Sequence, residues 1–179
     1  MTELESRQRK VLEQLAEDLK AEEIAALLDT KEETGMPFDF LDVVLDDLGG
    51  EDGEVFAQMF FQPMPEEQAK IAKVQYFTCI INVKEEIEEK NLAAAHAAAS
   101  ILNYFIPFGT FCLDPDQVTL LYKFSSPLPA DMDQEQLHSA VNLLSAQAAN
   151  LCDQYYSILS AIASGEAQVS DLGDFFPVE

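Results

Sequence analysis

Basic residues are scarce in this chain of 179 residues. It holds ten Lys and Arg against 33 Asp and Glu, which gives a formal charge of −23 and a pI near 4.1. A field of this sign repels nucleic acid and anionic membrane surfaces, so we exclude both as main partners. Cationic partners and divalent cations stay compatible with it.

Cysteine is also rare. Cys79, Cys112 and Cys152 are odd in number, widely spaced, and each is set in an apolar run. This pattern predicts buried, reduced thiols of a cytoplasmic protein. The first residues lack the basic and then apolar segments of a secretory signal, which favours the same compartment.

Histidine is limited to His96 and His138, and neither has a Cys or His partner at the spacing of a zinc site. The sequence contains no Gly-x-Ser-x-Gly elbow and no coenzyme fingerprint. We therefore expect no catalytic residue, no cofactor and no metal ligand, and a protein that is not an enzyme. A Cys–His nucleophile would need a contact that only the fold can make.

Formal charge is missing altogether from the segment 91–113, which is long enough to cross a bilayer. The segment is rich in alanine, contains the polar side chains of His96, Ser100 and Asn103, and is broken by Pro107 and Gly109. Because alanine gains little free energy on transfer to lipid, we expect this helix to be buried in protein and not in a membrane.

The longest regular pattern covers residues 133–164. Its apolar residues recur at alternating steps of four and three, which keeps them on one side of a helix roughly 45 Å long. They are Leu137, Val141, Leu144, Ala148, Leu151, Tyr155, Ile158 and Ile162. Asp133 and Gln136 form a capping box at its start, and Gly165 is its natural stop.

The rest of the chain divides into helices and hairpins. Thr2 and Glu5 form a capping box for a first helix, and Asn91 is a good N-cap for a later one. The segment 38–48 fits a strand and also fits a helix, and we favour strand. The predicted elements are a helix within 1–35, a hairpin of 38–48 and 54–62, a strand over 73–84, a helix after Asn91, a second hairpin of 109–113 and 117–125, and the long helix. We divide the chain into an N-terminal helix (1–35), an α+β domain (36–165) and a C-terminal tail (166–179).

Carboxylates crowd the first hairpin. They are Asp39, Asp42, Asp46, Asp47, Glu51, Asp52 and Glu54. Clustered carboxylates suit calcium, but the spacing is not that of an EF-hand loop, so we favour a solvated acidic hairpin. The alternative function that this segment suggests is a cation- or ligand-responsive regulatory domain using the 39–54 hairpin.

The long helix is nearly free of charge. Between residues 136 and 164 the only Asp, Glu, Lys or Arg is Asp153. Two acidic copies can dock only where like charge is absent, so this helix, or the alanine-rich helix before it, is a candidate homodimer contact. The other interpretation is that water covers its polar side. The candidate interface residues are Ser139, Asn142, Ser145, Asn150, Ser157, His96, Ser100 and Asn103.

One stretch resembles a known family. The letters ILNYFIPFGTFCLD over 101–114, VTLLY over 118–122 and PLP over 127–129 resemble the bacterial YbjN-type family, which has a type III secretion chaperone-like fold. The resemblance implies an α+β fold with an antiparallel sheet of about five strands, helices on one face, and the order α-β-β-β-α-β-β-α. It implies a non-enzymatic, chaperone-like module, homodimeric, that binds a protein segment. It brings no catalytic residues, and the acidic first third departs from it.

Overall fold

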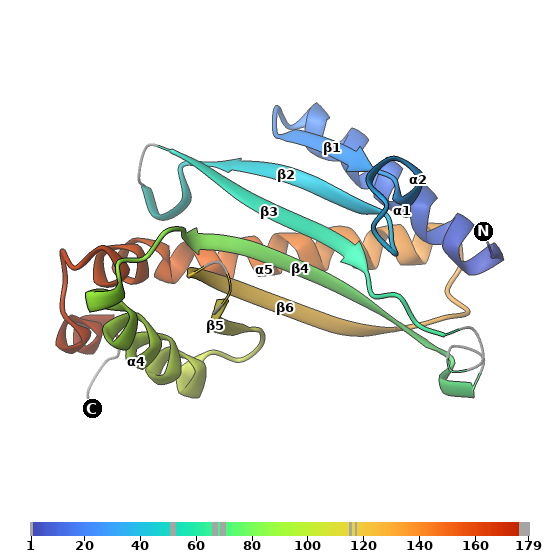
Figure 1. Ribbon diagram of the computed structural model, residues 1–179. Helices are drawn as coiled ribbons and strands as arrows, with labels where there is room; N and C mark the ends of the chain where they lie inside the picture. Colours follow the sequence, from blue (N-terminus) through green and yellow to red (C-terminus); the bar gives the residue numbers. More distant parts are fainter. Residues whose placement is uncertain are drawn as a thin grey trace. The chain divides into compact units, whose positions relative to one another are not determined.

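The computed structural model describes residues 2–50, 53–65, 68, 71–114, 116 and 118–175. The chain has an α+β fold with a six-stranded antiparallel sheet in the order β1-β2-β3-β4-β6-β5 (Figure 1). Among the described residues, no helix is both long and apolar enough to span a membrane.

The elements follow one another as helix α1 (Glu3–Ala21), strand β1 (Ala25–Asp29), helix α2 (Lys31–Thr34), strand β2 (Phe40–Asp46), 3-10 helix η1 (Leu48–Gly50), strands β3 (Glu54–Phe61) and β4 (Val74–Lys84), helix α4 (Glu89–Phe105), strands β5 (Thr110–Asp114) and β6 (Thr119–Pro129), helix α5 (Gln134–Ser164) and 3-10 helix η2 (Val169–Phe175). The chain forms two compact units. Unit 1 contains residues 1–45, 56–79 and 125–148, and unit 2 contains 46–55, 80–124 and 149–179.

The sheet has one strand more than the expected five, and the extra strand is β1. We predicted helix through residue 35, and this was wrong because α1 ends at Ala21. Glu23 takes a left-handed φ of 65°, and the Ile24 N–H bonds back to the Leu19 carbonyl at 2.9 Å, which closes the helix. The next residues pair antiparallel with β2, so tertiary pairing overrides a spacing that also fits a helix.

Unit 1 is built around α1, which packs on β1 (Figure 1). Strand β3 alternates buried and exposed side chains along its length, as a strand with one covered face does. The predicted strand character of 38–48 and the hairpin that it forms with 54–62 are confirmed, because β2 and β3 are neighbours in the sheet. The unit's buried core includes Val11, Leu12, Leu15, Leu41, Val43, Ala57, Met59, Phe61, Phe77, Leu137 and Val141.

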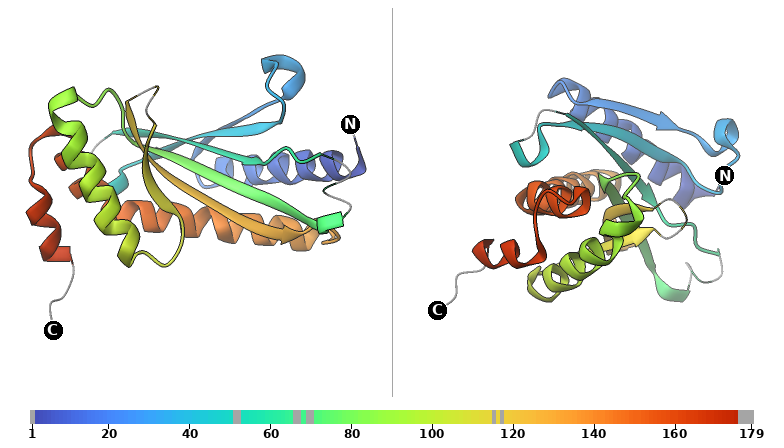
Figure 2. Two further views of the ribbon diagram at one scale, coloured as in Figure 1. Left: turned by 60° about the horizontal axis from the view of Figure 1, so that its bottom comes forward. Right: turned by 60° about the vertical axis from the view of Figure 1, so that its left-hand side comes forward.

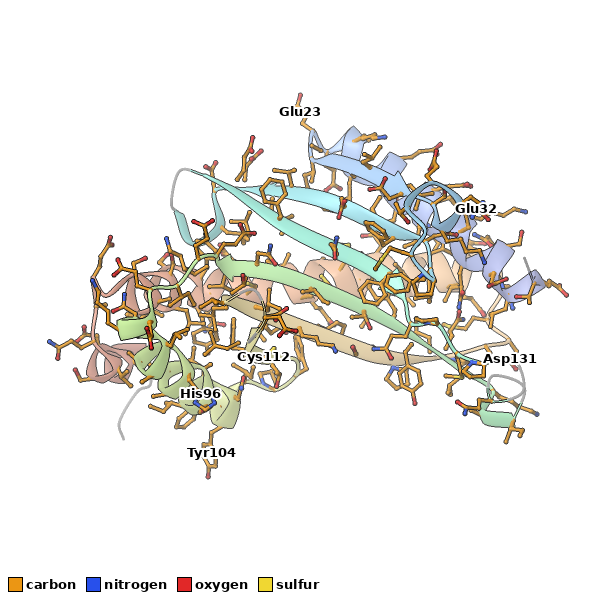
Figure 3. All side chains as sticks on the ribbon, viewed as in Figure 1. Glu23, Glu32, His96, Tyr104, Cys112 and Asp131 are labelled. Atoms are coloured by element: carbon orange, nitrogen blue, oxygen red, sulfur yellow. The ribbon has the colours of Figure 1, made fainter. Side chains whose placement is uncertain are left out.

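Unit 2 holds helix α4, which carries no formal charge after Lys90 and packs on β5 and on η2 (Figure 2). The helix begins at Glu89, with Glu88 as N-cap, so the prediction of Asn91 as N-cap was wrong. Its inward side is mostly alanine, which lets the backbone come close to its neighbours. Its outward side carries His96 and Tyr104, which project away from the helix (Figure 3).

Asn103 fixes α4 to β5. Its amide nitrogen donates to the Phe111 carbonyl at 2.8 Å, and its amide oxygen accepts from the Phe111 N–H at 2.8 Å. One side chain therefore satisfies both main-chain groups of a buried residue. The second predicted hairpin is also confirmed, since Thr110–Asp114 pairs antiparallel with β6.

The long helix α5 is confirmed at both ends. Asp133 accepts from the Gln136 N–H at 2.8 Å, and Gly165 follows the last turn with a φ of +80°. In unit 2, its one carboxylate, Asp153, accepts from the Gly49 N–H at 2.6 Å, and Ser157 donates to the Gly49 carbonyl at 2.6 Å. Asp153, the only carboxylate of this helix after its first turn, therefore secures the glycine turn after β2.

We expect Asn103→Ala to destabilise the protein by about 1–3 kcal/mol, because the Phe111 N–H and carbonyl lose their partner in a buried place. Chemical denaturation measures the free energy of unfolding. The exposed Asn150, also in a helix, is the matched control, and Asn150→Ala should change that free energy by less than about 0.5 kcal/mol. Equal effects of the two substitutions would contradict this role for Asn103.

Candidate binding groove

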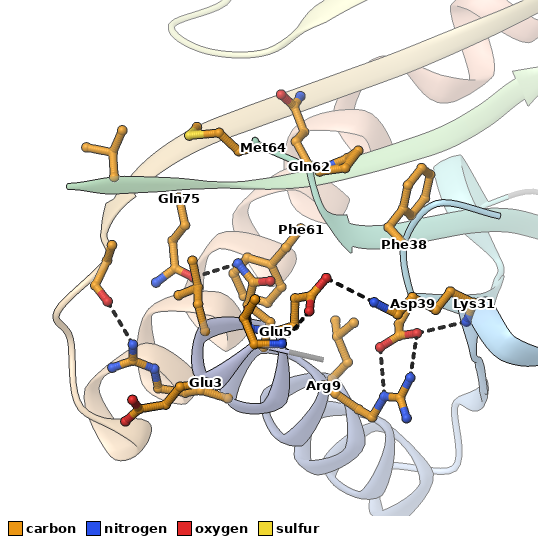
Figure 4. A pocket seen from close by; sticks show the side chains of 18 of the residues that line it. Glu3, Glu5, Arg9, Lys31, Phe38, Asp39, Phe61, Gln62, Met64 and Gln75 are labelled. Carbon is orange, nitrogen blue, oxygen red and sulfur yellow. Dashed lines mark hydrogen bonds and ion pairs between the residues drawn. The ribbon is translucent and has the colours of Figure 1, made fainter. Parts of the chain in front are cut away.

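Unit 1 contains a groove of about 750 Å³, a volume typical of ligand sites (Figure 4). The first half of α1 forms one wall. The other walls come from the segment before β2, from the end of β3 with the residues after it, from the start of β4, and from the residues that follow β6. Segments far apart in the sequence therefore build one site.

Apolar side chains make up much of this groove. They are Leu4, Leu12, Pro37, Phe38, Phe61, Pro63, Met64, Val74 and Ala130. Phe38 also stacks on Phe60 with ring centroids 4.6 Å apart and contacts Phe40 edge-on at 6.2 Å. Both of these rings are half-buried. The apolar surface of the groove therefore continues along unit 1 beyond the groove itself.

An ion-pair cluster fixes the wall beside Phe38. The Arg9 guanidinium donates to both oxygens of Asp39, at 2.8 and 3.0 Å, and also bonds Glu32. The Lys31 N–H donates to Asp39 at 2.8 Å, and the Lys31 ammonium lies 2.9 Å from Glu5 (Figure 4). This cluster ties α1 to the segment that leads into β2.

The cluster keeps its carboxylates ionised. Burial works to raise the pKa of Asp39, but the hydrogen bonds from Arg9 and from the Lys31 N–H outweigh it and lower that pKa. The Thr2 N–H and the Lys31 ammonium lower the pKa of Glu5. In turn, Asp39 and Glu32 raise the pKa of Arg9.

On the side of the groove opposite the ion-pair cluster, hydrogen bonds from amide and guanidinium side chains hold the wall in place. Arg7 donates to the carbonyls of Met132 at 2.6 Å and Ala130 at 2.9 Å. Gln75, with an exposed fraction of 3%, accepts from Gln8 at 3.0 Å and donates to a carbonyl at the end of β6 at 3.1 Å. These bonds connect α1 to the segment after β6 and leave the groove open between them.

The charges of the groove nearly cancel, unlike those of the whole chain. Four of the ten basic residues line it, together with four acidic residues. They are Arg7, Arg9, Lys31 and Lys73, and Glu3, Glu5, Asp39 and Asp131. No Cys, His or Ser is among the described residues that line it. Asp39 and Glu5, whose pKa values are lowered, are poor proton donors at neutral pH.

The interface candidates on α5 have different surroundings from one another. Ser139 and Asn150 are exposed, and so is Asn142, which donates to a carboxylate of α1 at 3.2 Å. Ser145 is buried and donates to a carbonyl one turn earlier at 2.9 Å, while Ser157 is bound to the glycine turn. None of these residues lines the groove.

The interface candidates on α4 also differ in their exposure and bonding. His96 and Ser100 are exposed, whereas Asn103 is bound to β5 by both atoms of its amide. Sequence patterns missed the groove itself. Its one signal in the sequence is that scarce basic residues occur close together at the start of α1.

The carboxylates of the acidic hairpin that the structure describes are not gathered at one metal site. Asp39 is paired with Arg9, and Asp42 accepts from Gln58 at 2.9 Å. Glu51 and Asp52 lie outside the described residues. Within the part of the chain that the structure describes, no group of three or more Asp, Glu, His or Cys is arranged to hold a metal ion. The solvated acidic hairpin stays a prediction, and the cation-responsive hairpin stays its alternative.

The three cysteines form no disulfide. Cys79 and Cys152 are buried, and Cys112 is half-buried. Burial raises the pKa of the Cys79 thiol to about 12 and also raises that of Cys112. Thiols with raised pKa values are poor nucleophiles at neutral pH.

No protein-family model and no curated protein matches this chain.

We expect Asp39→Asn to lower the free energy of unfolding at pH 7 by about 1–3 kcal/mol, because charge-assisted bonds to Arg9 and Lys31 are lost. The pKa of Asp39 is lower in the folded state, so its contribution is present above the unfolded pKa of about 3.9 and disappears as the pH falls through the folded value. The free energies of unfolding of wild type and Asp39→Asn should therefore converge as the pH falls. Denaturation of both forms between pH 7 and pH 2 measures this.

The control for that experiment is Glu32→Gln. The Glu32 side chain also bonds Arg9 but has an exposed fraction of 57%. Its loss should cost less than about 0.5 kcal/mol. A difference between wild type and Asp39→Asn that does not change with pH would contradict the ionic role.

The pKa of another carboxyl group, that of Asp29, is shifted in the opposite direction. Loss of surrounding water and the carboxylates of Asp42 and Glu33 raise the pKa of Asp29. Like charges in contact destabilise the folded state at neutral pH, so we expect Asp29→Asn to raise the melting temperature at pH 7. The gain should shrink as the pH falls through the raised pKa, because the wild-type side chain is then protonated. A drop in melting temperature at pH 7 would refute this repulsion.

Proposed function

We propose that this chain is a non-enzymatic, chaperone-like interaction module that binds an extended, apolar protein segment in the groove of unit 1. The observation that carries the proposal is the groove, with its apolar surface and its internally paired ionic groups. A site built in this way recognises shape and apolar side chains and offers no reacting group.

The form of the groove supports an extended segment as the ligand. Its apolar lining runs on through Phe38 to the half-buried rings of Phe60 and Phe40. A segment of several residues can therefore lie along this surface with alternate side chains in contact, as in other modes of peptide recognition.

Charge defines the class of segment further. The groove itself has four basic and four acidic side chains, so an uncharged apolar stretch is not repelled there. The chain as a whole has a charge of −23, which attracts a ligand with basic residues on either side of that stretch. We therefore infer an apolar segment with Lys or Arg at its flanks.

The resemblance to the YbjN-type family supports the same function from another part of the chain. Its motifs lie within 101–129, mostly in unit 2, whereas the groove lies in unit 1. The two arguments for protein binding therefore rest on almost entirely different residues. Three cysteines without a disulfide fit a cytoplasmic module.

A displayed library of random peptides, selected on the immobilised chain, tests this function. We expect the selected peptides to share an apolar stretch with basic flanks. Titration should show that Met64→Glu weakens their binding about tenfold or more, equivalent to about 1.4 kcal/mol, because it places a charge inside the apolar lining.

The matched control is Met36→Glu. Met36 also belongs to unit 1, has an exposed fraction of 46%, and does not line the groove. It should leave peptide affinity within about twofold of wild type. Selection of no peptide, or equal loss in both variants, would reject the groove as the binding site.

A further inference from the structure

One face of the sheet is left open in unit 1, where strands β1, β2 and β3 lie side by side (Figure 1). Along each strand, buried side chains alternate with more exposed ones, so the buried ones face the core and the others face away from it. None of these outward side chains is buried. We call them the open face: Ala25, Leu27 and Asp29 of β1, Phe40, Asp42 and Val44 of β2, and Phe56, Gln58 and Phe60 of β3.

Strand pairing arranges the open face in three rows. The Gln58 amide donates to Asp42 at 2.9 Å, and Leu27 is the partner of Asp42 in β1, so these three residues form the middle row. Because neighbouring strands run antiparallel, the rows on either side are two residues away along each strand. The first row is Ala25, Val44 and Phe56, and the third is Asp29, Phe40 and Phe60.

Apolar side chains make up most of the open face. Six of its nine residues are apolar, and Leu27 and Phe56 have exposed fractions of 62% and 52%. The strands that carry them are fixed from the other side by the core of unit 1. Grouped apolar side chains that stay exposed on a fixed element are typical of a docking surface.

The backbone of the sheet decides what shape of partner fits this face. Strands β2 and β3 have a neighbour on each side, so their main-chain groups bond within the sheet and offer nothing to a ligand lying on top. An extended segment placed there would leave its own N–H and carbonyl groups without partners, whereas a helix satisfies them internally. Three strands about 4.8 Å apart span about 10 Å, which is also the diameter of a helix with its side chains. The open face therefore suits a helix.

Charge decides the chemistry of that helix. Strands β1, β2 and β3, all of whose residues the structure describes, contain no Lys, Arg or His. The open face instead holds Asp29 and Asp42, and burial together with the nearby Asp42 carboxylate raises the pKa of Asp29. A basic side chain placed over this pair relieves the repulsion between its carboxylates. A second copy of the chain, which is acidic, brings the wrong charge.

We propose that the open face binds an amphipathic helix of a partner protein, with its apolar stripe on Leu27, Val44 and Phe56 and a Lys or Arg at Asp29 and Asp42. This site is distinct from the groove, since none of the nine residues lines the groove. The two sites adjoin where Phe38, in the groove wall, stacks on Phe60. The chain can therefore hold an extended segment in one site and a helix in the other.

A titration with designed peptides tests the proposal. The probe is a labelled peptide of about 18 residues, made of Leu and Lys with Leu at the spacing of one helix side. One comparison peptide has the same composition in shuffled order, and another has Glu in place of Lys. Fluorescence anisotropy should show that the wild-type chain binds the probe about tenfold more tightly than either comparison peptide, because only the probe combines an apolar stripe with positive charge.

Two single substitutions locate the site. Phe56→Ser should weaken binding of the probe about fivefold or more, since it removes the most exposed ring of the open face. The matched control is Leu143→Ser, because Leu143 is 59% exposed, belongs to unit 1 and lies on α5. It should leave the affinity within about twofold of wild type. Leu27→Ser provides a second variant of the open face if Phe56→Ser does not fold, as judged by circular dichroism.

A substitution of Asp29 separates binding from stability. Asp29→Asn should weaken binding of the probe about threefold or more, although we expect the same change to raise the melting temperature. A loss of affinity in a more stable protein cannot come from a damaged fold. Glu13→Gln is the control for net charge, because Glu13 is exposed on α1, and it should change the affinity by less than about 1.5-fold.

The following results would overturn the proposal. They are equal binding of the probe and either comparison peptide, no binding of the probe, equal weakening by Phe56→Ser and Leu143→Ser, and self-association of the wild-type chain that Phe56→Ser abolishes, which would assign the face to a second copy. The groove is judged separately. Met64→Glu should leave binding of the helical probe unchanged, and Phe56→Ser should leave binding of the groove peptides unchanged, so either site can fail alone.

Discussion

The bidentate contact between Arg9 and Asp39 is the interaction on which the groove depends. Basic residues are few in this chain, and this one is used inside unit 1 to hold α1 beside the segment that leads into β2. The Lys31 N–H donates to the same carboxylate, so helix, loop and strand meet at one point. Because a planar guanidinium and a carboxylate fit in one geometry, the contact sets direction as well as distance.

The scarcity of basic residues also determines how charge is distributed over the protein surface. Carboxylates far outnumber basic partners, so most of the surface repels another copy of the chain. Where charge is sparse, beyond the first turns of α4 and α5, the chain uses alanine, serine and other uncharged side chains. On α5 the remaining carboxylate, Asp153, is bound to the glycine turn and serves the fold of unit 2. On α4 the uncharged surface that includes Tyr104 stays exposed.

Sequence patterns correctly predicted the helices and strands whose formation depends mainly on residues close together in the sequence. The β-branched and aromatic residues of 73–84, the paired segments 109–113 and 117–125, and the period of 133–164 each correspond to the expected strand, hairpin or helix. The error at β1 has a physical source, because Ile24, Leu27 and Leu28 are spaced as on a helix and as on a short strand. Backbone pairing with β2 decides between the two, and that pairing joins residues 11 positions apart (Asp29 and Phe40) to 19 positions apart (Ala25 and Val44). The N-cap of α4 was misplaced by three residues, from Glu88 to Asn91, as helix ends often are.

The sequence by itself determined the α+β class, the long helix, the excess of negative charge and the lack of a catalytic motif, since each follows from composition or from contacts between near neighbours. The tertiary structure decided the rest. It brought Arg9 to Asp39, buried Ser145, left Tyr104 exposed, and formed a groove from residues that lie between positions 2 and 131. No periodicity contains that information, because a groove exists only where distant segments pack and leave space between them.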